Sequence, residues 1–293
     1  MRKINYEKAI DSIQKQVKGY LKDNNMQCVV IGISGGFDSG LNAALLSPIC
    51  QELGIPIIGR YIHIESNKEE ERERALAIGK IFTDSFKEVD LTPLYNESVK
   101  TIEEKEIKEL SYEDKLRRGN IKARLRMIYL FDLAQTHHGL VIDNDNLTEH
   151  LLGFWTLNGD VGGLTPLADL FKTEAYELAK AYMKRLNNEK AKEALQMVID
   201  AVPTDGLGIT SSDVEQFGAS SYEEVDNILY EYNKLGMKNH QDTIDELSFK
   251  LNKDVLEKII NRHKNSNFKR NFPYRIQLKG HVIPNEFGTK KIF

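Results

Sequence analysis

The chain has 293 residues, of which 41% are hydrophobic and 29% are charged, and its formal net charge at pH 7 is −4. This balance is typical of a globular protein and argues against a general affinity for nucleic acid. The N-terminal residues lack the apolar core of a signal peptide and no later run could span a bilayer, so we expect a cytoplasmic protein with no membrane partner.

The first predicted elements are a helix, a buried strand and a second helix. Apolar residues between Tyr6 and Leu21 lie on one helical face. The apolar run from Cys28 to Ile33 predicts a strand, and the periodic segment from Leu41 to Leu53 predicts a helix. Cys28 and Cys50 have no metal or redox spacing, so we expect both thiols to be buried.

A glycine turn of sequence SGGFDS, residues 34–39, joins this strand to the helix. We expect the backbone N–H groups of Gly35, Gly36 and Ser39 to point at one spot, where the helix dipole also favours an anion. The hydroxyls of Ser34 and Ser39 add donors for phosphate oxygens. The carboxylate of Asp38 fits such a site if Mg²⁺ lies between it and the phosphate. A glycine turn merely capped by Ser39 and Asp38 is the alternative without a ligand.

Strands and helices then alternate along the chain. The next predicted elements are a strand at Ile55–Ile64, a charged helix at Lys68–Phe82 capped by Ser66 or Asn67, a strand at Phe86–Leu91 and a charged, mobile segment at Tyr95–Leu110. A long helix is predicted from Arg117 to about His137, followed by a strand at Gly139–Ile142. Arginines crowd the predicted start of the long helix and oppose its dipole, which suggests a nearby negative partner; plain surface arginines are the alternative.

This alternation predicts an α/β fold, a doubly wound parallel sheet with flanking helices. Ligands of such sheets bind at the carboxyl ends of the strands. The 34–39 turn, Arg60 and the segment from Asp143 to Glu149 all follow strand ends, so we expect them to converge.

The rest of the chain is predicted to contain loops and helices. A glycine-rich loop, residues 158–166, is expected to cover a ligand, and a polar loop at 205–218 is expected to be mobile. Helices are predicted at Glu174–Leu186, Tyr222–Tyr232 and Val255–His263. We expect residues 1–293 to form a single domain with helical N-terminal and C-terminal extensions.

The SGGFDS turn resembles the SGGxDS loop of the ATP-pyrophosphatase superfamily, whose members cleave ATP between the α and β phosphates. Over roughly residues 5–280 the chain resembles the ammonia-dependent NAD synthetase family. Other matching segments are GNIKARLRM at 119–127, LLGFWT at 151–156, PLADLFKTEAYELA at 166–179, SSYEEVDNIL at 220–229 and FKRNFP at 268–273. The resemblance implies an adenine nucleotide alpha hydrolase-like fold. It also implies adenylation of deamido-NAD (nicotinic acid adenine dinucleotide) by ATP, release of pyrophosphate, and displacement of AMP by ammonia.

The resemblance also implies roles for individual residues. Asp38 and Glu149 would bind Mg²⁺, and Asp38 and Lys172 would be catalytic. Contacts with ATP are implied for Ser34, Gly35, Gly36, Asp38, Ser39, Arg60, Arg126, Asn144, Lys172 and Thr204. Contacts with deamido-NAD are implied for Arg124, Phe154, Asp160 and Lys269. The family implies a homodimer with the Arg117–His137 helix near its interface, supplied with free ammonia or with ammonia from a separate glutaminase.

Several positions depart from the family pattern. Asp143 and Asn144 replace a Gly-Thr pair after the fourth strand; the Asn144 amide can replace the threonine hydroxyl, and we expect the Asp143 carboxylate to face metal or solvent. Leu157 replaces a lysine, Phe268 replaces a histidine, and the loop at 159–166 is one residue short. Because most departures fall on the deamido-NAD side, two alternatives stay open. One is a ligase of the same fold that adenylates and amidates a different carboxylate, and the other is a non-catalytic nucleotide-binding homologue.

Overall fold

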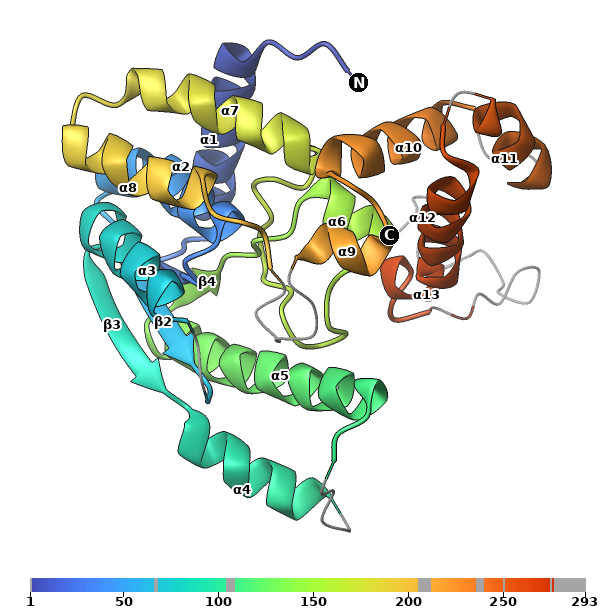
Figure 1. Cartoon of the computed structure of the whole chain (residues 1–293). Helices are drawn as coiled ribbons and strands as arrows, with labels where there is room; N and C mark the ends of the chain where they lie inside the picture. The colour runs from blue at the N-terminus through green and yellow to red at the C-terminus, as the bar shows by residue number, and fades with distance from the viewer. Residues whose placement is uncertain are drawn as a thin grey trace, which may run out of the picture.

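A computed structural model describes residues 2–65, 68–103, 109–204, 212–235, 240–249, 251–274 and 276. At its centre is a four-stranded parallel sheet with strand order β3-β2-β1-β4 (Figure 1). The strands are β1 (Cys28–Gly32), β2 (Ile57–His63), β3 (Ser85–Asp90) and β4 (Gly139–Val141). In the register of the sheet, Val29 of β1 lies between Ile57 of β2 and Leu140 of β4. Parallel pairing brings the carboxyl ends of all four strands to one edge, as the sequence predicts.

Helices cover both faces of the sheet, and alternate residues of the strands are therefore buried on opposite sides. Val29 and Ile31 belong to a large core on one face, whereas Cys28 and Val30 belong to a smaller core on the other. The larger core includes α1 (Tyr6–Asp23), α2 (Phe37–Leu53), α3 (Glu69–Phe82), α7 (Lys172–Arg185) and α8 (Glu189–Ile199). The smaller core includes α5 (Tyr112–Thr136), which packs on β1 and β4. The predicted doubly wound α/β fold is confirmed.

A third apolar cluster lies beside the sheet and joins one helix drawn in yellow-green to the orange and red helices of Figure 1. These helices are α6 (Leu147–Leu152), α9 (Asp213–Phe217), α10 (Tyr222–Lys234), α11 (His240–Ser248) and α12 (Lys253–Asn265), and the short helix α13 (Asn267–Arg270) follows α12. Leu152 of α6 and Phe171, which precedes α7, are buried in this cluster. The cluster therefore packs directly against the segments that carry Glu149 and Lys172.

Two predictions about the middle of the chain are wrong. Residues 95–102, expected to be mobile, belong to helix α4 (Thr92–Ile102), which begins with a proline in its first turn and buries Tyr95. The long helix α5 begins at Tyr112, where Ser111 and Asp114 form a capping box. Its arginines therefore lie beyond the first turn and do not oppose the dipole.

Smaller differences concern element ends and short helices. Helix α2 starts four residues earlier than predicted, at Phe37, and α8, α9, α11 and α13 have no counterpart among the predicted elements. Residues 213–217, expected to belong to a mobile loop, form α9 and bury Phe217. The proposed caps at positions 66 and 67, and residues 205–211 of the polar loop, lie outside the described residues. Both cysteines are buried free thiols, as predicted. Among the described residues, no helix is long and apolar enough to cross a membrane.

Candidate active site

The SGGFDS turn leads from β1 into α2 with a geometry that requires glycine. Gly35 has a φ of +80°, and a Cβ atom there would lie 2.0 Å from the backbone oxygen of Glu71. The carbonyl oxygen of Gly35 accepts a hydrogen bond from Arg74 Nε at 2.7 Å. The turn is therefore packed against α3 so closely that no side chain fits at position 35.

Hydrogen bonds within the turn fix its two serines. The Ser34 and Ser39 hydroxyl oxygens lie 3.1 Å apart, and Ser39 Oγ donates to the Gly36 carbonyl at 3.2 Å. Gly36 N–H donates to Ser34 Oγ at 3.1 Å, rather than toward a point shared with its neighbours. The alternative in which Ser39 and Asp38 cap the helix is wrong, because α2 has no side-chain cap. The first turn of α2 thus keeps N–H groups for an external acceptor.

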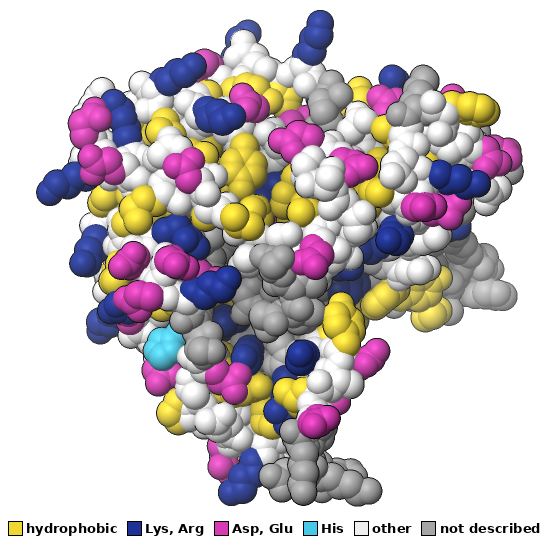
Figure 2. Space-filling view, viewed as in Figure 1, with side chains coloured by type: hydrophobic (Ala, Val, Ile, Leu, Met, Phe, Trp, Pro, Cys, Tyr) yellow, Lys and Arg dark blue, Asp and Glu magenta, His cyan; other side chains and the backbone are white. Residues whose placement is uncertain are grey.

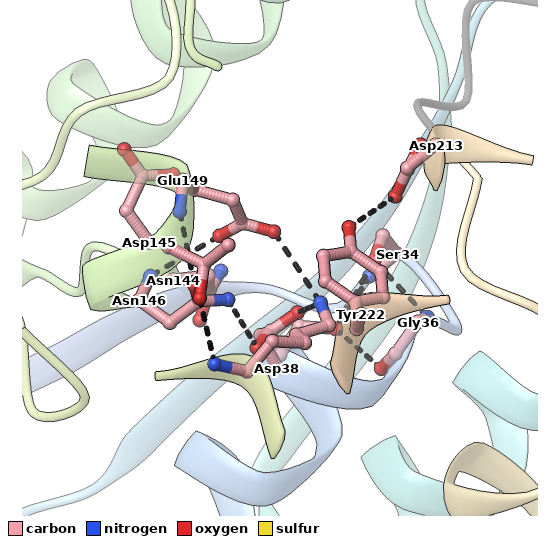
Figure 3. Close-up of polar contacts among 12 residues, drawn as sticks. Ser34, Gly36, Asp38, Asn144, Asp145, Asn146, Glu149, Asp213 and Tyr222 are labelled. Carbon is pink, nitrogen blue, oxygen red and sulfur yellow. Dashed lines mark hydrogen bonds and ion pairs between the residues drawn. The ribbon is translucent and has the colours of Figure 1, made fainter. Parts of the chain in front are cut away.

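Asp38 and Glu149 converge next to this turn, as Figure 3 shows. Asn146 begins α6 in a capping box with Glu149, whose Oε2 accepts the Asn146 N–H at 3.1 Å. The side-chain amide of Asn146 donates to Asp38 Oδ1 at 3.0 Å. The other oxygen of each carboxylate contacts the ammonium of Lys172, at 3.3 Å for Glu149. Residues from α2, α6 and α7 therefore meet at one point, as the sequence predicts.

Lys172 is 2% exposed and begins helix α7. Burial alone would lower the pKa of its ammonium, but the carboxylates of Asp38 and Glu149 outweigh burial, and the pKa is raised well above its usual value. Burial raises the pKa of Glu149 to about 8, against the attraction of Lys172 and with the repulsion of Asp38. One ammonium is therefore shared by two carboxylates, and its single positive charge does not neutralise both of them.

A buried carboxylate of α10, which was not identified from the sequence, hydrogen-bonds to the segments that carry Glu149 and Lys172. Asp226 of α10 is fully buried and accepts hydrogen bonds from the Thr148 hydroxyl and from the Thr173 N–H at 2.9 Å. Thr148 Oγ1 in turn accepts the backbone N–H of Lys172 at 2.8 Å. Burial raises the pKa of Asp226 to about 6. Asp226 thus links α6, which carries Glu149, to α7, which begins with Lys172.

Two cavities open next to these residues. The turn cavity, about 620 Å³, is lined by the 34–39 turn, and the side cavity, about 840 Å³, is lined by the exposed side of α5. The predicted site residues that line the turn cavity are Ser34, Gly36, Asp38, Ser39, Arg60, Arg126, Asn144, Glu149, Phe154, Asp160, Lys172, Thr204 and Lys269. Arg124 lines the side cavity, and Gly35 lines neither. Four residues line both cavities: Met127, Asp145, Trp155 and Lys269. The cavities therefore share a wall.

The basic side chains that line the cavities contact backbone carbonyls and not acids. Lys172 is the exception, since it pairs with Asp38 and Glu149; none of the others forms an ion pair within the described residues. Figure 2 shows several Lys and Arg side chains near the middle of the drawn face. The carbonyl contacts are made by Arg60, Arg74, Arg124, Arg126, Arg262, Lys269 and Arg270. Elsewhere, arginines such as Arg72, Arg118 and Arg185 pair with carboxylates. The cavities therefore have positive charge available for an anionic ligand.

Asp143 and Asn144, which follow β4 after Ile142, make different contacts. Asn144 donates to the Gly32 carbonyl at 3.2 Å and accepts from the Asn42 amide at 3.0 Å, so its side chain spans β1 and α2. The expectation that the Asp143 carboxylate faces solvent is wrong, because the side chain is buried. It is 4% exposed and accepts the Asp145 N–H at 2.9 Å and the Thr165 hydroxyl at 3.1 Å.

The residues assigned to deamido-NAD are spread around the shared wall. Arg124 donates to the carbonyl of Leu157 at 3.2 Å, and Asp160 accepts the Thr156 N–H at 2.7 Å. The Phe154 ring packs edge-on against Phe217, with a centroid distance of 5.0 Å. The two replaced positions, Leu157 and Phe268, line neither cavity.

Other wall residues were not identified from the sequence. Trp155 and Arg270 lie within the segments LLGFWT and FKRNFP, so the resemblance contained a signal for both. Arg262 of α12 had no such signal, because only tertiary packing places its guanidinium next to both the Phe154 and the Phe217 ring, 5.2 and 5.1 Å from their centroids.

The chemistry of the donors fits Mg²⁺. Asp38 and Glu149 present hard carboxylate oxygens to one point, which a cation already shares. The described residues contain no group of three or more His, Cys, Asp or Glu side chains that could bind a metal ion by themselves. A magnesium ion bound by this pair would therefore need phosphate oxygens and water to complete its octahedron.

The fold and the sequence both have known relatives. The chain is 34% identical over 231 residues to an NH(3)-dependent NAD(+) synthetase of Finegoldia magna, covering 77% of this chain and 85% of the relative. Its structure is similar to an NMN synthetase from Francisella tularensis (TM-score 0.72, 23% identity, 97% of this chain and 100% of the other). It is also similar to an NH3-dependent NAD synthetase from Campylobacter jejuni (TM-score 0.69, 22% identity, 94% and 100%). The sequence model of the NAD synthase family matches residues 9–273, and the predicted resemblance is confirmed: this chain belongs to the NAD synthase family.

Proposed function

We propose that this enzyme converts deamido-NAD to NAD with ATP and ammonia, releasing AMP and pyrophosphate. The observation that carries the proposal is the convergence of Asp38, Glu149 and Lys172 beside the start of α2, in a cavity where Arg126 and Lys269 are held by backbone carbonyls. A triphosphate and a second phosphate-bearing substrate together supply the matching negative charge. Relatives named NH(3)-dependent NAD(+) synthetases support the choice of substrates.

In the proposed first step, ATP occupies the turn cavity. The N-terminus of α2, the serines of the turn and Arg126 bind its phosphates, and Asp38 and Glu149 would bind Mg²⁺, which supplies charge neutralisation at the phosphates. An oxygen of the nicotinate carboxylate attacks the α-phosphorus, and the bond from this phosphorus to the bridging oxygen breaks. Pyrophosphate leaves with that electron pair, next to the Lys172 ammonium. These groups orient the reactants and reduce the repulsion between two anions.

In the proposed second step, ammonia attacks the carbonyl carbon of the adenylated acceptor. The carbon–nitrogen bond forms, AMP leaves with the electrons of the carbon–oxygen bond, and the nitrogen loses a proton to water. The shared wall of Met127, Asp145, Trp155 and Lys269 surrounds the place where the contents of the two cavities meet. No side chain of this site needs to form a covalent bond with substrate.

The direct test mixes the purified protein with ATP, Mg²⁺, ammonium and deamido-NAD. NAD is followed by a coupled dehydrogenase signal, and AMP is measured in the same samples. The proposal requires NAD and AMP to appear one for one and to depend on ammonium. AMP release that does not depend on deamido-NAD would exclude this acceptor.

A second candidate is amidation of a different carboxylate by the same site. Asp143, which replaces a family glycine, lines the side cavity and favours this alternative, because it changes the wall facing the acceptor. Deamido-NMN is the natural competitor to assay, since one structural relative is an NMN synthetase. A higher kcat/KM for deamido-NMN would select this candidate. A non-catalytic homologue is disfavoured by the convergence of Asp38, Glu149 and Lys172.

The oligomer that we propose is a homodimer formed through α5. Ile128 and Phe131 are 62% and 47% exposed on this helix, next to the side cavity. Light scattering should give twice the mass of one chain, and Ile128→Asp together with Phe131→Asp should give one chain mass. A monomeric wild-type protein would refute the dimer. The cytoplasmic location stays a prediction.

A further inference from the structure

The loop at 158–166 is attached to the end of β4 by its backbone. Leu164 forms a parallel bridge with Ile142, and its carbonyl accepts the Asp143 N–H at 2.9 Å. Gly163 donates to the carbonyl of Val141 at 2.8 Å. A Cβ atom on Gly162 would lie 2.5 Å from the Asp143 nitrogen, so the approach requires glycine.

The Asp143 side chain adds contacts that the backbone does not provide. Besides the Asp145 N–H, its carboxylate accepts the Thr165 hydroxyl at 3.1 Å, and Thr165 belongs to the loop. The carboxylate has no ion pair with any basic side chain of the described residues. A carboxylate buried without a cation is stable only when its oxygens are hydrogen-bonded. Its contacts therefore hold the carboxylate and the loop together.

The same loop forms part of the side cavity. Asn158, Val161 and Thr165 line this cavity together with Asp143, and Ile128 and Phe131 of α5 also line it. None of the four loop and strand-end residues lines the turn cavity. Gly159 and Asp160 of the same loop line the turn cavity, so a shift confined to residues 161–165 would change the side cavity and leave the turn cavity intact.

We propose that Asp143 is a positioning residue that clamps the 158–166 loop through Thr165, and thereby sets which acceptor the side cavity accepts. The inference rests on the proposed function, because it takes the side cavity as the site of the acceptor. A fixed wall discriminates between a dinucleotide and a mononucleotide acceptor by shape. A loosened wall discriminates less.

The test compares Thr165→Val, which removes only the hydroxyl link, with Asp143→Asn and Asp143→Ala. Thr83→Val is the control, because Thr83 donates to the Gly79 carbonyl at the end of α3, and neither residue lines a cavity. KM and kcat are measured for deamido-NAD, deamido-NMN and ATP, and hydrogen exchange is followed at residues 158–166.

Thr165→Val should raise the KM for the preferred acceptor about 3- to 10-fold, in proportion to one lost hydrogen bond. The KM for ATP should stay within about 2-fold, and the ratio of kcat/KM values for the two acceptors should move toward one. The loop should exchange faster. Asp143→Ala should have a larger effect, and Asp143→Asn a smaller one, because an amide can accept the Asp145 N–H and donate to the Thr165 oxygen.

Equal rises in KM for ATP and the acceptor would overturn the clamp, and so would unchanged acceptor preference in a variant whose loop exchanges faster. Unchanged exchange in Asp143→Ala would also overturn it. If the wild-type protein amidates neither acceptor, the proposed function fails and this inference fails with it. Normal wild-type turnover with unchanged preference in the variants removes the inference alone.

Discussion

Asp38 and Glu149 each place one carboxylate oxygen on Asn146 and the other on Lys172. The backbone N–H and the side-chain amide of Asn146, together with one ammonium, therefore set the distance between two carboxylates that come from different helices. Such an arrangement is preorganised for a divalent cation, because the protein itself overcomes part of the repulsion between the two charges.

Replacing Asp38 with asparagine should lower pyrophosphate release by about 100-fold or more, because the site loses one of its two carboxylates. The release is measured with a coupled pyrophosphatase assay at saturating ATP. Asp11→Asn is the matched control, since Asp11 pairs with Arg185 away from both cavities. Full activity of Asp38→Asn would remove Asp38 from the metal site.

Lys172→Met should destabilise the protein by about 3–5 kcal/mol, because two buried carboxylates lose the ammonium they share. Chemical denaturation without metal gives this value. Mg²⁺ should then raise the midpoint more in the variant than in the wild type, since a cation replaces the missing ammonium. Lys180→Met, which breaks an exposed pair with Glu177, should change stability by less than about 1 kcal/mol. Equal midpoints for the two variants would contradict this reading.

Asp226→Asn should change how stability depends on pH. The pKa of Asp226 is raised from 3.8 to about 6, so the folded protein favours the protonated form. The stabilisation from this group is complete below about pH 4 and is lost as the pH rises through 6. The asparagine variant lacks this loss. The difference in free energy of unfolding, variant minus wild type, should therefore rise by up to about 3 kcal/mol as the pH increases from 4 to 7. Urea titrations at four pH values measure the difference, and parallel curves for the two proteins would show that Asp226 keeps an ordinary pKa.

Gly35→Ala and Gly54→Ala form a matched pair, since both glycines have positive φ angles, +80° and +68°. An added Cβ would clash with the Glu71 backbone at position 35, whereas nothing lies within 4 Å at position 54. Both variants should lose about 1–2 kcal/mol from backbone strain, but only Gly35→Ala should also weaken ATP binding, by about 10-fold or more. Equal ATP affinities, measured by calorimetry, would show that the turn tolerates displacement from α3.

The strand ends were predictable from sequence, because short apolar runs and glycine turns are local signals. The positions of Asp38 and Glu149 follow from the rule that parallel strands end at one edge. The start of α5 was predicted five residues too late, at Arg117, where the run of basic residues begins. The capping residues Ser111 and Asp114, which mark the actual start, stand earlier in the chain. The capping residues were a local signal for the helix start, but the prediction followed the basic residues instead.

Contacts between distant segments could not be predicted. Asp226 and Thr148 meet only after α10 packs on α6, and nothing near either residue in the sequence indicates the pairing. Asp143 shows the same limit, because a carboxylate after a strand suggests metal or solvent until the Thr165 loop is folded over it. The roles of residues that act through tertiary contacts can be recognised only when the fold is known.

The wall shared by the two cavities has a thermodynamic consequence. Met127, Asp145, Trp155 and Lys269 face both occupants, so a ligand that shifts these side chains in one cavity changes the affinity of the other. Linkage requires the effect to be reciprocal and equal in factor. A candidate acceptor can therefore be recognised before any turnover, by the change it produces in the dissociation constant of a non-hydrolysable ATP analogue.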